Sequence, residues 1–250
     1  MKIKNVLVSQ PKPAEVEKSP YYLLAKKYKV NIDFHKFISI EGVKAIDFRK
    51  DRIAILDHTA VIFTSRNAVD HFFRLAKEMR VEVPDTMKYF CVSEAIAFYL
   101  QKYVQYRKRK IFYGRQNFEQ LMELINKHKS DNFLLPCSDV SEKDLSQILN
   151  ENKINHSKAI MYLTVSSNLS SIEIEKYDML VFFSPSGVKS LFVNFPKFQQ
   201  NHTLIAAFGP ATCKAVEEAG LKLSIEAPTK TAPSMTMALE QYIDELIKAK

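Results

Sequence analysis

The sequence predicts an α/β fold of two flavodoxin-like parallel-sheet domains, and three observations lead to this prediction. Residues 179–191 (MLVFFSPSGVKSL) join a continuous apolar run to a hydroxyl-rich turn and then to helical spacing. Such a run is typical of a strand buried on both faces. Residues 60–69 (AVIFTSRNAV) repeat the pattern, with Ser65 aligned to Ser184. Strand and helix signals alternate along the rest of the chain, which favours parallel sheets covered by helices.

The repeat continues downstream in the same order. Residues 88–103 parallel residues 203–221, and residues 110–125 parallel residues 223–243, at a nearly constant offset. One strand–turn–helix unit is common in α/β proteins, but three in the same order indicate an internal duplication. The chain has 250 residues, which is enough for two such domains.

Composition bears on the compartment and the partners. A hydrophobic content of 46% allows buried cores, and a formal net charge of +8 suits an anionic partner as well as it suits a solvated basic surface. The cysteines, Cys91, Cys137 and Cys213, are odd in number and far apart, as in a reduced compartment. No apolar run approaches a membrane span or a signal peptide. We therefore expect a cytoplasmic monomer with neither membrane nor nucleic-acid partners.

Local signals predict the elements before the first repeat. Residues 4–9 form a strand, and residues 20–27 form a helix with Ser19 as its N-cap and a proline at its first position. Residues 30–40 alternate apolar and polar side chains, which predicts one long, half-exposed strand. A helix over 47–56 leads into the first repeat.

From there, strands alternate with helices. The segment 158–165 is long, like the segment 30–40, and both are long enough to carry the chain from one domain to the other. We therefore expect five strands in each domain. The later strands are predicted at 61–65, 88–93, 110–114, 132–137 and 158–165, and then at 179–184, 203–208 and 221–226.

These strands divide the chain into a discontinuous first domain and an inserted second domain. We expect the first to comprise residues 1–36 plus 167–250 and the second residues 40–160, with linkers at about 36–40 and 160–167. Two extended linkers would form a two-stranded β-ladder with a cleft between the domains. Because open parallel sheets bind ligands beyond the carboxyl ends of their strands, the candidate site comprises the turns at 64–67, 184–187, 209–212 and 229–234.

Several common chemistries lack their motifs in this sequence. There is no Gly-x-Gly-x-x-Gly, no Gly-Lys-Ser/Thr and no Gly-x-Ser-x-Gly, which argues against dinucleotide binding, a P-loop and a triad hydrolase. The six histidines show no metal-ligand spacing. Receiver domains need an acidic cluster after the first strand, where this chain has Ser9-Gln10. The motifs therefore give no support to a nucleotide cofactor or to a histidine metal site.

The candidate turns are instead rich in hydroxyl and amide side chains. Each one alone is explained as a helix N-cap, but together they offer many neutral donors, which suits a ligand with several carboxylates. Arg66, Lys189 and Lys214 lie in or just after these turns, whereas the basic run from Lys102 to Lys110 is typical of a solvated helix end. The turn residues are Thr64, Ser65, Asn67, Ser184, Ser186, Thr212, Thr229 and Thr231.

Four segments resemble the uroporphyrinogen-III synthase family. They are VIFTSRNAV, VFFSPSGVKSL, IAAFGPATCKAVEEAGL and APTKTAPSMTMAL, in that order, and the resemblance spans the whole chain. It implies two α/β domains joined by a two-stranded ladder, with the site in the cleft. It also implies that the substrate is hydroxymethylbilane, a linear tetrapyrrole with several carboxylates. The implied reaction gives uroporphyrinogen III, with loss of water and inversion of the last pyrrole ring, without cofactor or metal.

The resemblance also implies the site residues. The family's tyrosine near the end of the returning ladder strand falls on Tyr162, which we expect to be catalytic as a donor to the departing hydroxyl. The family's late threonine falls on Thr231, with Thr229 as the other candidate. The expected substrate-binding residues are Ser9, Gln10, Thr64, Ser65, Asn67, Ser93, Ser184, Ser186, Gly209, Thr212 and Thr231.

Two departures from the family pattern weaken part of this assignment. Ser9-Gln10-Pro11 replaces Thr-Arg-Pro, and the middle domain has Ser93 and Ala95-Ile96 in place of a glycine and a Thr-Ala. These departures do not imply loss of activity. One alternative function is a non-catalytic two-domain binder or sensor of a polycarboxylate, which keeps the cleft without the chemistry. A weaker alternative is nucleic-acid contact through the basic run, which lacks interleaved exposed aromatics and a recognised motif.

Overall fold

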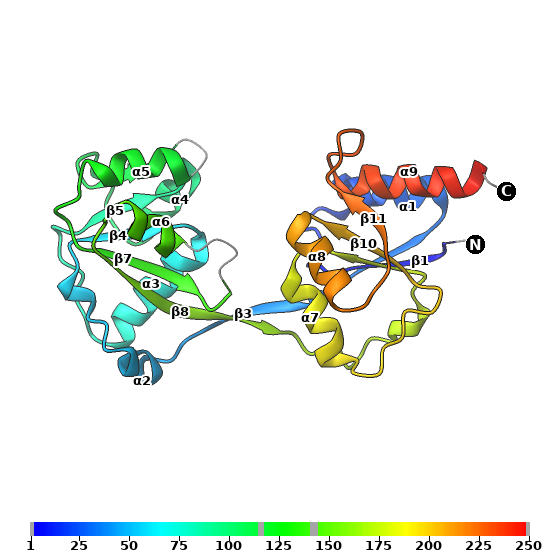
Figure 1. Ribbon diagram of the computed structural model, residues 1–250, viewed down its shortest axis with the longest axis horizontal. Coiled ribbons are helices and arrows are strands. Elements are labelled where there is room, and N and C mark those ends of the chain that lie inside the picture. The colour runs from blue at the N-terminus through cyan, green and yellow to red at the C-terminus, as the bar shows by residue number, and fades with distance from the viewer. Residues whose placement is uncertain (1–2, 115–117, 141–144, 249–250) are drawn as a thin grey trace. The chain divides into compact units, whose positions relative to one another are not determined.

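The computed structural model describes residues 3–114, 118–140 and 145–248, which form two compact units (Figure 1). Unit 1 comprises Met1–Ser39 and Val165–Lys250, and unit 2 comprises Ile40–Thr164. The chain passes between the units twice, within strand β3 (Ile38–Gly42) and within strand β8 (His156–Ser166). The boundaries expected from the sequence differ from these limits by only a few residues.

Unit 1 is built on a five-stranded sheet in the order β11-β10-β9-β1-β2, in which adjacent strands are parallel. Alternate strand residues face opposite sides of a sheet. Val6 accordingly belongs to the same buried cluster as Leu239 of α9, whereas Leu7 belongs to the cluster that contains Leu191 of α7. Helices α1 and α9 therefore cover one face, and α7 and α8 the other (Figure 1). The elements are β1 Asn5–Val8, β2 Asn31–Phe34, β9 Met179–Phe182, β10 Leu204–Phe208, β11 Leu223–Ala227, α1 Pro20–Tyr28, α7 Pro185–Asn194, α8 Pro210–Glu218 and α9 Met235–Lys248, with short 3-10 turns at Val16–Lys18 and Ile174–Lys176.

Unit 2 is built on a six-stranded sheet in the order β3-β8-β7-β4-β5-β6. The five strands expected for this domain are therefore wrong by one, because β3 joins the sheet beside β8. Strands β4 to β8 pair in parallel. Phe63 packs with Phe72 of α3 on one face, and Ile62 packs with Leu121 of α5 on the other. Helices α3 and α4 therefore cover the first face, and α5 and α6 the second. The further elements are β4 Ala60–Phe63, β5 Lys88–Cys91, β6 Ile111–Tyr113, β7 Phe133–Ser138, α2 Ala45–Phe48, α3 Arg66–Glu78, α4 Glu94–Leu100, α5 Phe118–Asn126 and α6 Leu145–Glu151.

The two sheets share one strand order, although the chain enters them at different strands. The order β2-β1-β9-β10-β11 in unit 1 matches β8-β7-β4-β5-β6 in unit 2. Strands β9, β10 and β11 thus correspond to β4, β5 and β6, and these strands lie in the three pairs of segments that repeat in the sequence. The order in unit 1 is that of flavodoxin-like folds, which confirms the expected fold class. Residues 115–117, inside the third repeat, lie outside the described residues.

The single long strand expected over 30–40 is wrong, because β2 ends at Phe34 and β3 begins at Ile38. Between them, Phe37 is buried with its ring 5.8 Å from that of Phe182. The Phe37 carbonyl accepts hydrogen bonds from the Ser167 N–H and the Ser190 hydroxyl. The segment leaves one sheet and joins the other at this point. The apolar–polar alternation is interrupted at this point by His35-Lys36 and Phe37-Ile38, a signal of the break that the prediction of one long strand overlooked.

The helix expected over 47–56 is also wrong in its extent. A short α2 ends at Phe48 and is followed by 3-10 turns at Arg49–Asp51 and Ile55–Asp57. Arg52 stands between these turns with a left-handed φ of 56°, a conformation that ends a helix. By contrast, Ser19 does cap α1 as expected, since its hydroxyl accepts a hydrogen bond from the Tyr21 N–H.

Candidate functional site

The first candidate turn of unit 2 follows β4 and begins helix α3. Ser65 is the N-cap of this helix, and its hydroxyl oxygen accepts a hydrogen bond from the Ala68 N–H at 3.1 Å. Thr64 and Ser65 are partly exposed, and Asn67 is exposed in the first helical turn. The residue types and the backbone both match an N-cap turn, where side-chain and backbone donors can meet an anion.

Tyr162 reaches this turn from β8. Its hydroxyl lies 3.2 Å from the Ser65 hydroxyl, and its ring stacks on that of His71 at 5.1 Å between centroids. The side chain is only 7% exposed, and burial raises the pKa of the phenol despite the opposing hydrogen bond with Ser65. One of the two O–H groups is used within the pair. The pair therefore has a single hydrogen left for a ligand, and Ser65 is the more exposed of the two residues.

His71 and Arg74 support Tyr162, and the sequence analysis did not single them out. Arg74 Nε donates to His71 Nδ1 at 3.1 Å, so Nδ1 is an acceptor and the imidazole hydrogen is on Nε2. Burial and the nearby Arg74 charge lower the pKa of His71, which favours this neutral form. The signal in the sequence was weak, because polar residues on an amphipathic helix are usually explained by exposure to solvent.

The second candidate turn of unit 2, after β5, lacks the capping hydrogen bond that the first turn has. Ser93 occupies the N-cap position of α4, but its side chain makes no capping hydrogen bond. Close by, the carboxylate of Asp70 accepts hydrogen bonds from the hydroxyls of Tyr99 and Tyr103. Arg66 places its guanidinium 5.3 Å from the centre of the Tyr99 ring. This network holds the side chain of Arg66 against the Tyr99 ring. The sequence analysis did not single out Tyr99 or Tyr103.

The corresponding first turn of unit 1 brings together Ser184 and Ser9. Ser184 caps α7, and its hydroxyl oxygen accepts a hydrogen bond from the Gly187 N–H at 3.1 Å. A Cβ built on Gly187 would lie 3.5 Å from the Ser184 hydroxyl oxygen and 3.7 Å from that of Ser9. The two serines therefore flank the same buried glycine. Ser186 and Gln10 are partly exposed beside them.

The second turn of unit 1 needs glycine at its first position. Gly209 has a φ of +88°, where side chains are strained, and its N–H donates to the Ala227 carbonyl. Thr212 follows in the first turn of α8 but is only 3% exposed. It therefore offers a ligand little surface in this structure.

The last turn distinguishes the two late threonines. The Thr229 hydroxyl accepts a hydrogen bond from the Ala232 N–H at 3.0 Å, and the Thr229 N–H donates to the Ala232 carbonyl. Thr229 thus closes the turn. Thr231 is exposed, and its hydroxyl has only a 3.4 Å contact, with Thr229, among the described residues. Of the two, Thr231 is the one whose hydroxyl is available to a ligand.

The remaining basic residues are mostly at the surface. Lys189 is exposed, and Lys214 pairs with Glu218 at 3.5 Å. The run from Lys102 to Lys110 follows the end of α4 as expected, with Lys102 near Asp70 and Arg107 near Asp85. Across the described ranges, no group of three His, Cys, Asp or Glu side chains could hold a metal ion, and no helix is long and apolar enough to cross a membrane.

Comparison with known proteins assigns the chain to a family. Its fold resembles that of uroporphyrinogen-III synthetase from Helicobacter pylori, with a TM-score of 0.62 and 18% identity over 97% of this chain and 100% of that one. A mutant uroporphyrinogen III synthase from Thermus thermophilus gives a TM-score of 0.55 and 15% identity over 97% and 99%. No curated protein sequence matches. The family model of uroporphyrinogen-III synthase HemD matches residues 34–237. The chain therefore belongs to the uroporphyrinogen-III synthase family.

Proposed function

We propose that this protein is a uroporphyrinogen-III synthase that acts on hydroxymethylbilane. It closes this linear tetrapyrrole with loss of water and inversion of the last ring, and the product is uroporphyrinogen III. The family match over residues 34–237 carries the proposal. The proposed enzyme is a cyclising lyase that works as a cytoplasmic monomer, without cofactor, metal, membrane or nucleic acid.

The geometry of the strand-end turns supports this function. Both units have a serine N-cap after a buried parallel strand, where helix N–H groups favour an anion. The substrate's carboxylates would bind to these N–H groups and to the exposed or half-exposed hydroxyl and amide side chains. The proposed contacts are Ser9, Gln10, Thr64, Ser65, Asn67, Ser93, Ser184, Ser186, Gly209 and Thr231, with a smaller contribution from buried Thr212.

Tyr162 would act mainly through Ser65. Its raised pKa makes the phenol a weaker proton donor, and the hydroxyl already contacts Ser65. If Tyr162 donates to Ser65, then Ser65 can donate to the substrate while still accepting from the Ala68 N–H. In this arrangement Tyr162 is a positioning residue. The alternative role is direct donation by Tyr162 to the departing hydroxyl. The positioning role and the direct role predict different losses of turnover in the Tyr162→Phe variant.

Product analysis tests the function directly. Freshly prepared hydroxymethylbilane closes without a catalyst to isomer I, so the fraction of isomer III measures the enzyme. We expect mainly isomer III with the wild-type protein. Binding of the substrate with only isomer I formed would instead identify a carrier or sensor. No binding and no isomer III would exclude both functions.

Matched serine variants test whether the turns form the site. The double variant Ser65→Ala/Ser184→Ala should raise the Michaelis constant about 10-fold or more, the effect of losing two hydrogen bonds to charged groups. Ser170→Ala changes an exposed serine in the loop after β8 and should leave the kinetics unchanged. Equal kinetics for the double variant and the Ser170 control would contradict the assigned turns.

A further inference from the structure

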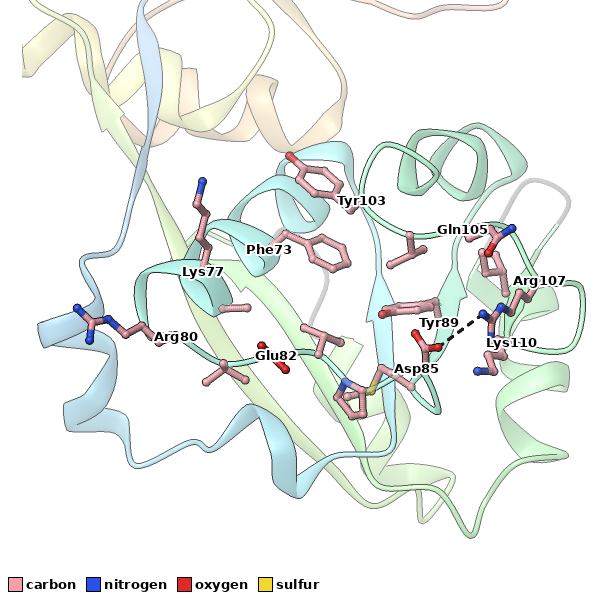
Figure 2. Close-up of a pocket in the computed structure, with 17 residues that line it drawn as sticks. Phe73, Lys77, Arg80, Glu82, Asp85, Tyr89, Tyr103, Gln105, Arg107 and Lys110 are labelled. Carbon is pink, nitrogen blue, oxygen red and sulfur yellow. Dashed lines mark ion pairs between the residues drawn. The ribbon is translucent and has the colours of Figure 1, made fainter.

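Unit 2 has a cavity of about 860 Å³ at the amino-terminal edge of its sheet (Figure 2). Its walls come from the last two turns of α3, the loop 81–87 before β5 and the loop 103–110 before β6. Since β4, β5 and β6 are parallel, loops that precede strands lie at the edge opposite to the turns that follow them. The cavity is therefore separate from the turns of Ser65 and Ser93.

Aromatic rings form one wall of this cavity. The rings of Phe73 and Tyr103 stack with centroids 4.5 Å apart and planes inclined by 4°, and Figure 2 shows them side by side. Tyr89 lies beside them, with its ring 6.4 Å from that of Phe73. Binding sites for small molecules have volumes of about 300–1,000 Å³ and largely apolar or aromatic walls. The cavity thus has the size to hold a small molecule and one aromatic wall for a planar ring, while polar side chains form much of the remaining lining.

The rim carries more positive than negative side chains. Lys77, Arg80, Arg107 and Lys110 contribute four cations, whereas Glu82 and Asp85 contribute two anions. Arg107 and Asp85 form an ion pair at 3.6 Å (Figure 2). Lys77, Arg80 and Lys110 form no ion pair with any residue that the structure describes. The uncompensated charge would favour an anionic ligand.

One wall residue, Tyr89, offers its hydroxyl to the cavity. Tyr89 is only 5% exposed, and its hydroxyl makes no hydrogen bond with any described residue. The hydroxyl oxygen itself is accessible from the cavity, so it is free to bind a ligand. Burial and the nearby Asp85 raise the pKa of this phenol, which keeps it a hydrogen-bond donor at neutral pH. A donor directed at a cavity with a basic rim suits an anionic acceptor.

We propose that this cavity is a second binding site, distinct from the substrate turns, for a small planar aromatic anion. The ring would lie against Phe73 and Tyr103. The anionic group would accept a hydrogen bond from Tyr89 and lie near Lys110, which Figure 2 shows on the same side of the cavity. This ligand class differs from the flexible tetrapyrrole of the proposed reaction, and the site does not depend on that reaction.

Binding of 2-naphthalenesulfonate tests the proposal, with uncharged 2-naphthalenemethanol as the matched probe. The chain has no tryptophan, so naphthalene fluorescence can be followed without interference from indole. We expect saturable binding of the sulfonate at one site per chain, weakened by salt, and at least about 3-fold weaker binding of the alcohol. Absence of saturable binding, or equal affinity for the two probes, would overturn the proposal.

Variants locate the binding. Lys110→Gln and Tyr89→Phe should each weaken sulfonate binding about 3- to 10-fold, the effect of one hydrogen bond or partly desolvated charge. Lys108→Gln and Arg109→Gln remove the same charge from the same loop but not from the cavity wall, and should leave affinity unchanged. Similar losses in the two sets would place the probe elsewhere. The surface variants keep the test valid if Tyr89→Phe does not fold, and turnover plays no part in the readout.

Discussion

The two units hold the segments that pass between them with different chemistry. In unit 2, Arg74 of helix α3 donates from its guanidinium to the carbonyls of Val43 (2.8 Å) and Met161 (3.2 Å). In unit 1, helix α7 uses two neutral side chains instead: Ser190 donates to the Phe37 carbonyl, and Asn194 donates to the Ser167 carbonyl at 2.9 Å. Both helices follow equivalent serine caps in the repeat.

This difference shows that a repeated backbone can keep its shape while the stabilising side chains change. We call the contacts of Arg74 in unit 2, and those of Ser190 and Asn194 in unit 1, the clamp of each unit. The charged clamp of unit 2 also requires a glycine, since a Cβ on Gly42 would lie 2.6 Å from Arg74 Cζ. Gly42 therefore leaves room for the guanidinium. Because hydrogen bonds to charged groups are stronger than neutral ones, we expect unit 2 to depend more on its clamp than unit 1.

Removing the two clamps should give the largest effect. Arg74→Ala should lower the free energy of unfolding by about 2–3 kcal/mol, whereas Ser190→Ala should cost about 1 kcal/mol. Urea denaturation measures both. Glu78→Ala removes only the half-exposed ion pair with Arg74 and should cost less than about 1 kcal/mol. If Arg74→Ala and Glu78→Ala cost the same, the carbonyl contacts are not what stabilises unit 2.

The units also differ in how they fix the start of a central strand. In unit 2, Asp131 accepts from the Thr59 hydroxyl at 2.9 Å and from the Lys88 ammonium at 2.7 Å. In unit 1, Asp178 accepts from the backbone N–H groups of Lys4 and Asn5. Burial opposes ionisation of Asp131, but Lys88 and Thr59 outweigh it and hold the pKa of this carboxyl below its usual value.

Asp131→Asn should therefore cost about 1–3 kcal/mol at pH 7. A lowered folded-state pKa stabilises fully above the ordinary carboxyl pKa of about 3.9, and that stability is lost as the pH falls through the lower value. The difference in urea midpoint between wild type and variant should thus shrink below about pH 4. Asp57→Asn, at an exposed site nearby, should show no such convergence. A constant difference for Asp131→Asn down to pH 3 would contradict the assigned ionisation.

The N-cap Ser65 of unit 2 has a hydrogen-bond partner in the Tyr162 hydroxyl. The equivalent Ser184 of unit 1 has no such tyrosine partner among the described residues. Tyr162→Phe should slow turnover about 3- to 10-fold, the effect of one hydrogen bond, while the product remains mainly isomer III. Product chromatography and initial rates measure this. A loss of about 100-fold or more in turnover number, with the Michaelis constant unchanged, would instead identify Tyr162 as a general acid. Full activity would leave it a packing role only.

The smallest expected effect compares the two N-caps. Ser65→Ala and Ser184→Ala should each destabilise the protein by about 1 kcal/mol through loss of the cap. Ser65→Ala should cost about 0.5–1 kcal/mol more, because it also leaves the Tyr162 hydroxyl unpaired. The extra cost should vanish in the Tyr162→Phe background, as a double-mutant cycle would show. The same extra cost in that background would mean that the two hydroxyls are not coupled.

Much of the fold and part of the site followed from local sequence patterns. The buried run before Ser184, the repeat around Ser65 and the Ser19-Pro20 helix start depend on residues close together in the chain. Their periodicity and capping chemistry appear in the structure nearly where they were expected. The assignment of Tyr162 came from family resemblance rather than from any local pattern.

Contacts between distant segments were decided by the tertiary structure. The break at Phe37 exists because Ser167 and Ser190, more than a hundred residues later, bind its carbonyl and Phe182 packs on its ring. The pairing of Tyr162 with Ser65, and of Arg74 with two carbonyls, likewise requires a strand and a helix to be packed together. Hydrophobic periodicity specifies which face of an element is buried but not which partner covers it. The sequence alone therefore determined most of the elements and their order along the chain, whereas packing determined where the segment around Phe37 breaks and which polar groups meet.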